Sequence, residues 1–362
     1  MPKILIVAPS WVGDAVMSQV LFKRLQERHD TNLILDVFAP AWTLPLFRHM
    51  PEVHDAIPNP FTHGALQLGE RYRIGKTLRT KHYDQVIVLP NSIKSALVPF
   101  FARIPVRTGF VGELRWGLLN DARWLDKQAL PLMVERFLAL AEAKSPLRPP
   151  FSKWGTNSLP GETLPPLTKG GWGGFAPHLQ ADPAESRKTA QKLGIPLDQP
   201  VAAFCVGAEY GPAKRWPASH FAELARLLSA DGYQIWLIGS AKDAAIGENI
   251  QHLSGGLCRN LCGATDLSDA IDLLASASVV VSNDSGLMHI AAALDKPMLA
   301  LYGSSSPDFT PPLSDKARIL SLNLPCSPCF KRECPLGHFN CMNQMLPQQA
   351  LIALRQLLTP PQ

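Results

Sequence analysis

The sequence predicts an α/β protein of two domains, each a doubly wound parallel sheet, that face each other across a cleft. Short apolar segments of strand length alternate with segments of helical periodicity in both halves of the chain. This alternation is typical of parallel sheets with helices on both faces. A stretch rich in proline and glycine separates the two halves near residue 150, and a length of 362 residues is enough for two domains.

The N-terminal half begins with an apolar segment at residues 4–8, which predicts a buried strand. A helix is expected to follow from about Asp14 to Arg28, because its apolar residues recur near one stripe. Residues 33–39 and 85–90 predict two further strands, and the second of these leads into a helix at 93–104.

Residues 145–182 differ in composition from both halves. They contain SPLRPP and LPGETLPPLTKGGWGGFAP and show little periodicity, as linkers do. We therefore expect an N-terminal domain over 1–150, a linker with a Pro/Gly-rich insertion over 151–198, a C-terminal domain over 199–346, and a C-terminal helix and tail over 347–362.

The alternation resumes in the C-terminal half. Strands are expected at 201–207, 233–239, 278–282 and 297–303, and helices at 218–230, 243–253, 267–276 and 286–294. Ligands of doubly wound sheets bind at the carboxyl ends of the strands. The segments expected around the cleft are therefore Gly13 and Asp14, Asn91 and Ser92, and residues 207–214, 239–243 and 284–289.

The composition fits a protein with large buried sheets, since 46% of the residues are hydrophobic and 18% are charged. The net charge of +5 suits anionic substrates or a membrane surface and does not favour a nucleic acid partner. No run approaches the roughly 18 apolar residues that span a bilayer. The apolar run at the N-terminus is shorter than a signal peptide needs, so a cytoplasmic protein is expected.

The stretch VVVSNDSGLMHIAAAL at 279–294 changes from strand to helix within one polar turn. Unpaired N–H groups and the helix dipole attract anions such as phosphate at such a turn. The alternative is an ordinary connection in which Asn283, Asp284 or Ser285 caps the helix. His289 lies one helical turn past Ser285, so it either faces the same cleft or is a core histidine.

Lys214 and Arg215 stand just before a predicted helix start, where positive charge opposes the helix dipole. An anionic ligand explains this misfit, and we interpret Lys214 in that way, while Arg215 fits a surface charge equally well. The sequence has neither a P-loop nor a dinucleotide fingerprint. A nucleotide phosphate would be held instead by Lys214 and the turn at 284–287.

Asp14 follows the first strand, where a carboxylate could act as a general base at the mouth of the cleft. The alternative is an acid that only stabilises the helix N-terminus. Gly13 beside it would allow a sugar or another backbone to come close. Farther along, a basic stretch at 71–83 is either a solvated face or part of a site for an anionic acceptor.

Four of the seven cysteines lie close together, in PCSPCFKRECPLGHFNCM. The spacing of Cys326, Cys329 and Cys334, followed by His338 and Cys341, resembles compact zinc sites but fits no common class closely. A structural zinc ion, a redox-labile cluster and buried thiols all remain open. None of these would be a catalytic metal.

Six segments in this order resemble the ADP-heptose:lipopolysaccharide heptosyltransferases, and within that family the heptosyltransferase II group. They are VAPSWVGDAVMSQ, LPNSIKSALVPF, GAEYGPAKRWP, GSAKD, SNDSGLMHIAAAL and GSSSPDFTPP. The resemblance implies a B-type glycosyltransferase fold of two Rossmann-like domains. It implies an inverting, metal-independent transfer of heptose from ADP-heptose to the first heptose of the lipopolysaccharide inner core, with no cofactor required. The acceptor would be heptosyl-Kdo-lipid A, reached by peripheral contact at the cytoplasmic face of the inner membrane.

The resemblance also implies roles for single residues, with the acceptor in the N-terminal domain and the donor in the C-terminal one. Asp14 would be the base, and Lys214 would pair with the donor diphosphate. The donor-binding residues would be Gly207, Glu209, Asp243, Leu267, Asp284, Ser285, Gly286, Leu287 and His289. The acceptor-binding residues would be Gly13, Asn91, Ser92, Lys94, Arg107 and Arg115. The insertion before residue 198 and the cysteine cluster depart from what this mechanism requires.

Two alternatives stay open at this point. One is heptosyltransferase I, or another nucleotide-sugar transferase on the same fold. The other is a two-lobed ligand-binding protein without catalytic activity, against which the lack of an export signal and the presence of both Asp14 and Lys214 count.

Overall fold

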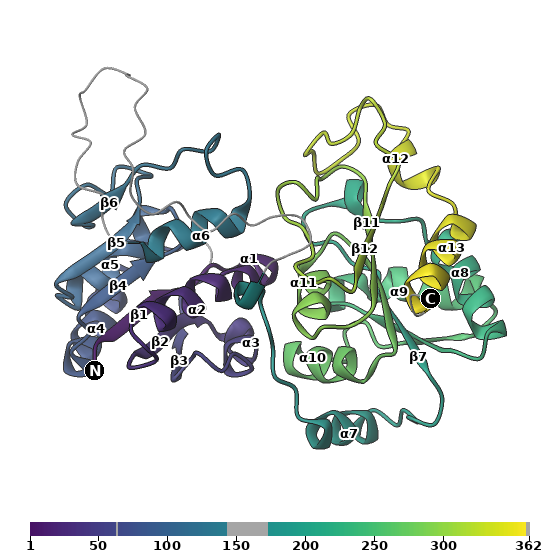
Figure 1. Cartoon of the computed structure of the whole chain (residues 1–362), viewed down its shortest axis with the longest axis horizontal. Coiled ribbons are helices and arrows are strands. Elements are labelled where there is room, and N and C mark those ends of the chain that lie inside the picture. The colour runs from purple at the N-terminus through teal and green to yellow at the C-terminus, as the bar shows by residue number, and fades with distance from the viewer. Residues whose placement is uncertain (63, 143–172, 360–362) are drawn as a thin grey trace. The chain divides into compact units, whose positions relative to one another are not determined.

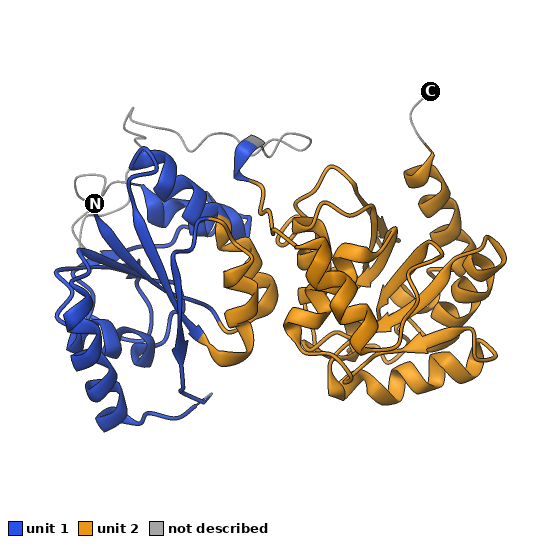
Figure 2. Ribbon diagram, turned by 90° about the horizontal axis from the view of Figure 1, so that it is seen from below, with its two compact units in different colours: residues 1–9, 20–39, 52–175 blue, residues 10–19, 40–51, 176–362 orange. Residues whose placement is uncertain are grey.

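The computed structural model describes residues 1–62, 64–142 and 173–359. The chain forms two compact units (Figure 2). Unit 1 comprises Met1–Pro9, Val20–Ala39 and Glu52–Phe175, and unit 2 comprises Ser10–Gln19, Pro40–Pro51 and Ala176–Gln362. Two short N-terminal segments that each follow a strand of unit 1 therefore belong to unit 2.

Unit 1 is built on a six-stranded sheet in the order β3-β2-β1-β4-β5-β6 (Figure 1). The central strand β1 pairs in parallel with β2 and β4, and β5 pairs in parallel with β4 and β6. The strands are β1 (Lys3–Val7), β2 (Ile34–Pro40), β3 (Asp55–Asn59), β4 (Gln85–Val88), β5 (Val106–Phe110) and β6 (Asp121–Arg123). This is the strand order of a Rossmann-like sheet.

The helices of unit 1 are α2 (Gln19–Arg28), α4 (Leu68–Leu78), α5 (Ile93–Phe101) and α6 (Met133–Ala141), with 3-10 turns η2 (Arg79–Lys81) and η3 (Gly173–Phe175). Helices α4 and α5 pack together, and apolar residues of both join those of β1 and β4 in one core.

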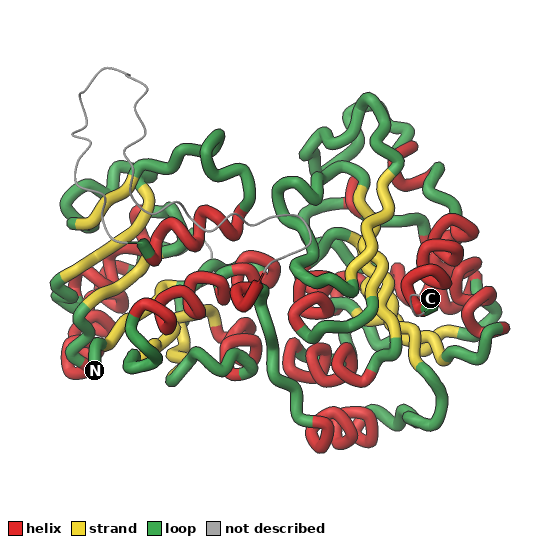
Figure 3. The backbone as a smooth tube through the Cα atoms, viewed as in Figure 1, coloured by secondary structure: helices red, strands yellow, loops and turns green. Residues whose placement is uncertain are grey.

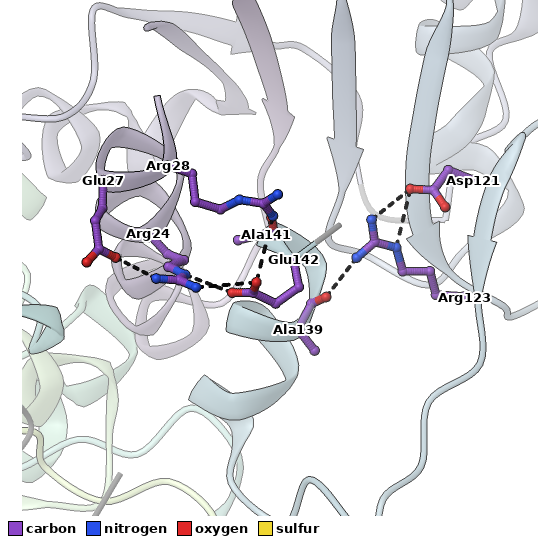
Figure 4. Close-up of polar contacts among 8 residues, drawn as sticks. All are labelled: Arg24, Glu27, Arg28, Asp121, Arg123, Ala139, Ala141 and Glu142. Carbon is purple, nitrogen blue, oxygen red and sulfur yellow. Dashed lines mark hydrogen bonds and ion pairs between the residues drawn. The ribbon is translucent and has the colours of Figure 1, made fainter. Parts of the chain in front are cut away.

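Arginines fix the end of α6, the last helix of unit 1 before the gap in the described residues (Figure 4). Arg28 and Arg123 donate hydrogen bonds to main-chain carbonyls in the last turn of α6. Arg24 of α2 forms an ion pair with Glu142, with 2.7 Å between Nε and Oε1. Cations are favourable at this end of a helix, because its last carbonyls are unpaired.

Unit 2 repeats the same sheet order, as β12-β11-β10-β7-β8-β9. The strands are β7 (Val201–Cys205), β8 (Gln234–Ile238), β9 (Cys258–Asn260), β10 (Val279–Asn283), β11 (Met298–Tyr302) and β12 (Ala317–Ser321). The central strands β7, β10 and β11 are buried at every position. Strands covered on both faces need such continuous apolar runs.

Two groups of helices pack on this sheet (Figures 1 and 3). Helix α8 contacts α9 and α13, and together they form one core with one face of the sheet. Helix α10 contacts α3, α7 and α11, and α11 contacts α1. Their bounds are α1 (Val12–Met17), α3 (Leu44–Arg48), α7 (Pro183–Lys192), α8 (Ala218–Ala230), α9 (Ala244–Leu253), α10 (Leu267–Ser276), α11 (Gly286–Ala293) and α13 (Pro347–Leu358). The short elements are α12 (Asn340–Asn343) and the 3-10 turns η1 (Ala41–Thr43), η4 (Pro212–Lys214) and η5 (Ala241–Asp243).

The predicted fold class of two doubly wound parallel sheets is confirmed. The helices predicted at 218–230 and 267–276 have the predicted bounds. The single helix predicted from Asp14 to Arg28 is wrong, because α1 and α2 are separate helices that meet at Ser18. Part of the linker predicted at 151–198 lies outside the described residues, and its described part contains α7. Within the described chain, none of the helices is both long and apolar enough to cross a membrane.

Candidate active site

The polar turn between β10 and α11 leaves the helix start without a side-chain cap among the described residues. Ser285 occupies the N-cap position but makes no capping hydrogen bond. The Asn283 side chain is engaged elsewhere, since its Oδ1 accepts from the N–H of Trp216 at 3.0 Å and its Nδ2 donates to the carbonyl of Val206 at 2.8 Å. The first N–H groups of α11 are therefore available for an anion.

Lys214 lies at the end of η4, between β7 and α8, and reaches the same turn. Its ammonium is 2.5 Å from Oδ2 of Asp284, so the third candidate cap of the turn forms an ion pair instead. Both side chains are mostly removed from solvent, with exposed fractions of 17% and 5%. A cation thus stands beside the positive end of α11, as an anion site requires.

His289 is buried on α11 one turn beyond Ser285. Burial lowers its pKa to about 4, with Asp284 opposing and Lys214 adding to this effect. The imidazole is therefore neutral at pH 7. Its Cδ2 is 2.9 Å from the position that a Cβ would take on Gly13, so the packing of α1 against α11 requires glycine there.

Asp14 lies in the first turn of α1 and is half-buried. Burial raises its pKa to about 6, and the positive charge of Lys214 moderates that rise. A carboxylate with a pKa near 6 is largely ionised at pH 7 and still has useful basicity. Asp14, Lys214 and His289 belong to unit 2, so the structure brings these three predicted residues into one unit.

Other predicted donor residues hold neighbouring loops together. Asp243 is buried and accepts hydrogen bonds from the N–H and hydroxyl of Ser240, at 3.0 and 2.7 Å. A Cβ on Gly207 would lie 2.4 Å from the Asp243 carboxylate, so this close approach also needs glycine. Glu209 forms an exposed ion pair with Lys242 at 2.5 Å, and Leu267 is half-buried at the first position of α10.

The predicted acceptor residues are divided between the two units. Gly13 belongs to unit 2, whereas the other five belong to unit 1. Asn91 and Ser92 follow β4, and Arg115 joins them there by donating to Asn91 Oδ1 at 3.2 Å. Lys94 donates to the carbonyl of Gly64 at 2.6 Å.

Two arginines of that set are occupied by the chain itself. Arg115 is 2% exposed and donates to the carbonyl of Pro90 at 2.6 Å. Arg107 donates to the carbonyls of Leu118 and Ile104, at 2.6 and 2.7 Å. The Arg115 bond lies at the carboxyl end of β4, whereas the Arg107 bonds reach segments just before β5 and β6, at the amino ends of those strands. The acceptor roles of both arginines remain predictions.

The seven cysteines are free of disulfide bonds. Backbone N–H groups, chiefly that of Phe339, lower the pKa of Cys334, while burial raises the pKa of Cys341. In the part of the chain that the structure describes, no group of three or more His, Cys, Asp or Glu side chains is arranged to hold a metal ion.

The sequence prediction placed residues 207–214 at the cleft but gave Tyr210 no role of its own. Its ring centroid is 5.1 Å from the ammonium of Lys214, and its hydroxyl donates to the carbonyl of Phe330 at 2.8 Å. An aromatic residue four positions before a lysine interpreted as a ligand was the only signal in the sequence. It could not reveal a partner 120 residues away.

Comparisons with known proteins show the family of the chain. The profile of glycosyltransferase family 9 (heptosyltransferase) matches residues 71–340. The chain is 49% identical over 361 residues to lipopolysaccharide heptosyltransferase 2 of Salmonella typhimurium, with 99% of each chain covered. It is also 49% identical over 360 residues to lipopolysaccharide heptosyltransferase 2 of Escherichia coli, with 98% of each covered.

The solved structure of Escherichia coli ADP-heptose LPS heptosyltransferase II matches with a TM-score of 0.81 and 46% sequence identity. The match covers 98% of both chains. Both the relatives and this structure span nearly the whole chain, and the family profile covers most of it. The chain therefore belongs to glycosyltransferase family 9, the heptosyltransferases.

Proposed function

We propose that the protein transfers heptose from ADP-heptose to the first heptose of the lipopolysaccharide inner core, with inversion at the anomeric carbon. Support comes from the relatives named lipopolysaccharide heptosyltransferase 2, which match over nearly their full length. The single observation that supports this donor site is the ion pair of Lys214 with Asp284 at the uncapped start of α11.

The donor diphosphate is assigned to the start of α11. Backbone N–H groups there would bind phosphate oxygens, and Lys214 would bind another. An ammonium has three N–H donors, so Lys214 can hold Asp284 and a phosphate oxygen at the same time. These groups would stabilise the leaving ADP as its charge grows, which favours the transition state over the ground state.

Asp14 is assigned as the general base. The acceptor hydroxyl attacks the anomeric carbon, a new C–O bond forms as the bond to the ADP oxygen breaks, and Asp14 takes the hydroxyl proton. General-base assistance of this kind is worth about 10²–10⁴-fold. Because Lys214 and the α11 dipole supply positive charge at the leaving group, we propose that the transfer needs no divalent metal ion and no cofactor.

The acceptor, heptosyl-Kdo-lipid A, is assigned to the N-terminal domain (1–150), and the donor to the C-terminal domain (199–346). Asn91, Ser92 and Lys94 would contact the acceptor from the loop after β4. We further propose peripheral contact with the cytoplasmic face of the inner membrane, since the acceptor is a lipid and the net charge of +5 suits an anionic surface.

A turnover assay tests this function. Purified protein is given ADP-heptose with an acceptor that ends in the first heptose, and in parallel with one that ends in Kdo. We expect ADP release and a heptosylated product only with the heptose-terminated acceptor. Transfer to the Kdo-terminated acceptor would indicate heptosyltransferase I activity, and binding of ADP-heptose without turnover would indicate a non-catalytic protein.

A further inference from the structure

Two cations, Lys214 and Arg332, lie against the ring of Tyr210. The ring of Tyr210 has the Lys214 ammonium 5.1 Å from its centroid and the guanidinium carbon of Arg332 5.3 Å from the same point. Each cation is attracted to the electron-rich face of the ring. Arg332 comes from the cysteine-rich segment between β12 and α12 (Figure 1), more than a hundred residues after Lys214 in the chain.

Three hydrogen bonds fix the backbone around Arg332. The N–H of Phe330 donates to the carbonyl of Ser304 at 2.7 Å, just after β11. The Tyr210 hydroxyl donates to the Phe330 carbonyl at 2.8 Å, and the N–H of Ala213 donates to the Arg332 carbonyl at 3.0 Å. The segment is thereby tied both to the end of β11 and to the loop that carries Lys214.

The glycine at position 211 makes this approach possible. A Cβ on Gly211 would lie 2.4 Å from the Arg332 carbonyl oxygen, which is backbone and cannot move aside cheaply. The loop of Lys214 and the segment of Arg332 are therefore in direct main-chain contact, and Arg332 is held next to the candidate donor site.

The charges of the two cations are balanced differently. Lys214 has Asp284 as its counterion. Arg332 is exposed, and among the described residues no carboxylate forms an ion pair with its guanidinium. Holding two cations against one ring raises the local positive potential, which a polyanion lying beside both of them would offset. A planar guanidinium suits such a ligand, since it can bind two phosphate oxygens at once.

We propose that Arg332 binds the diphosphate of the nucleotide-sugar donor together with Lys214, which shares the ring of Tyr210 with it. This assignment rests on the proposed function. It gives the segment at 326–341 a role that the sequence alone did not suggest: it carries a phosphate-binding arginine to the site. The anion could instead belong to the acceptor, as a phosphate or carboxylate group, and the measurements below separate these two sources.

The test compares Arg332→Gln, which removes the charge, with Arg332→Lys, which keeps it. Lys331→Gln is the matched control, because Lys331 is also exposed and has no contact with Tyr210 among those described. Calorimetry gives the Kd of ADP and of inorganic pyrophosphate, and steady-state kinetics give KM for each substrate.

We expect Arg332→Gln to weaken the binding of ADP and of pyrophosphate about tenfold, as loss of a charged hydrogen bond does. The donor KM should rise to a similar extent. Arg332→Lys should recover part of the loss, and Lys331→Gln should match the parent.

Other results overturn the proposal. An unchanged Kd for ADP with a raised acceptor KM would assign Arg332 to the acceptor, and no change in any constant would make it a solvated surface charge. Lys214→Ala, measured in parallel, separates this inference from the proposed function. If Lys214→Ala weakens ADP but Arg332→Gln does not, only the assignment of Arg332 fails; if neither does, the proposed donor site fails as well.

Discussion

At the scale of single residues, the candidate site depends on environments that a sequence does not display. Asp14 was predicted as a base from its place after the first strand, but its raised pKa arises from burial. His289 was equally consistent with a core histidine, and the structure shows it buried, with a pKa that the charges of Asp284 and Lys214 also influence. The raised pKa of Asp14 and the burial of His289 both depend on neighbours that folding brings together. Residue type and spacing could therefore suggest which residues form the site, but they could not predict the protonation state of those residues.

The pKa of Asp14 predicts the pH dependence of the reaction. The base must be ionised, and its pKa in the free enzyme is raised to about 6. The value of kcat/KM should therefore rise as the pH increases through about 6 and level off above it, because kcat/KM reports the free enzyme. Asp14→Asn should lower kcat by about 10²-fold or more and remove this limb.

The Kd of ADP is the control for that variant. It should stay near the parent value, because the diphosphate is assigned to Lys214 and α11 and not to Asp14. A variant that turns over at nearly the parent rate with the same pH limb would mean that another group is the base.

The close contact of Gly13 with His289 predicts a second effect. Gly13→Ala places a Cβ 2.9 Å from the buried ring, so α1 or His289 must shift. We expect a lower melting temperature and a lower kcat, with overpacking typically costing 1–3 kcal/mol. Gly69→Ala is the control, since Gly69 lies in α4 with open space around its Cβ position. Alanine there should leave activity unchanged and change stability by no more than about 0.5 kcal/mol. Equal melting temperatures for the parent and Gly13→Ala would contradict the packing argument.

At the scale of elements, periodicity predicted long regular segments well and short or charged ones poorly. The helices α8 and α10 have clear apolar stripes, and their bounds were predicted correctly. The break at Ser18 was missed, because the apolar residues of α1 and α2 continue one pattern across it. Helix α4 was seen only as a basic stretch, since few of its residues are buried.

The turn before α11 shows that contacts with distant elements decide whether a helix start is capped. Asn283, Asp284 and Ser285 were all reasonable helix caps, and the structure uses none of them as such. Their partners, Trp216 and Lys214, lie about 70 residues earlier in the chain. Local sequence could not decide between a capped helix and an open anion site, because the decision depends on these distant partners.

Lys214→Ala tests this element directly. It removes the charge-assisted contact to the diphosphate, so ADP should bind more weakly by about 1.5–3 kcal/mol, roughly 10- to 150-fold. It also leaves Asp284 buried without its counterion, so the melting temperature should fall. Lys242→Ala is the control, because Lys242 belongs to an exposed ion pair and its loss should change stability little. Unchanged affinity for ADP in Lys214→Ala would show that Lys214 only neutralises Asp284.

At the scale of the whole molecule, alternating strands and helices were enough to predict two parallel sheets of the same kind. They were not enough to predict the division of the chain into compact units. Residues 10–19 and 40–51 belong to unit 2, although the strands before them belong to the sheet of unit 1. Contacts such as those between α1 and α11 determine this grouping, and they join segments far apart in the sequence.

The donor diphosphate is assigned to residues of unit 2, so we predict that ADP stabilises unit 2 and not unit 1. All seven cysteines lie in unit 2, and Cys205, Cys258 and Cys262 are buried there. Alkylation of these three thiols in moderate denaturant therefore reports the opening of unit 2, while hydrogen exchange of β1 and β4 reports unit 1. A ligand present at 100 times its Kd stabilises the state that binds it by about 2.7 kcal/mol. ADP at that concentration should slow alkylation of the buried thiols by about 100-fold and leave exchange in β1 and β4 unchanged.

The variant Lys214→Ala provides the control for this measurement. At the same ADP concentration it should show much weaker protection of the buried thiols, because the lost contact raises the Kd. Mass spectrometry reads each cysteine separately, so the more accessible thiols of Cys326, Cys329, Cys334 and Cys341 do not obscure the result. If ADP protected β1 and β4 as strongly as the thiols, the two units would open together or share the ligand. The prediction of selective stabilisation would then be wrong.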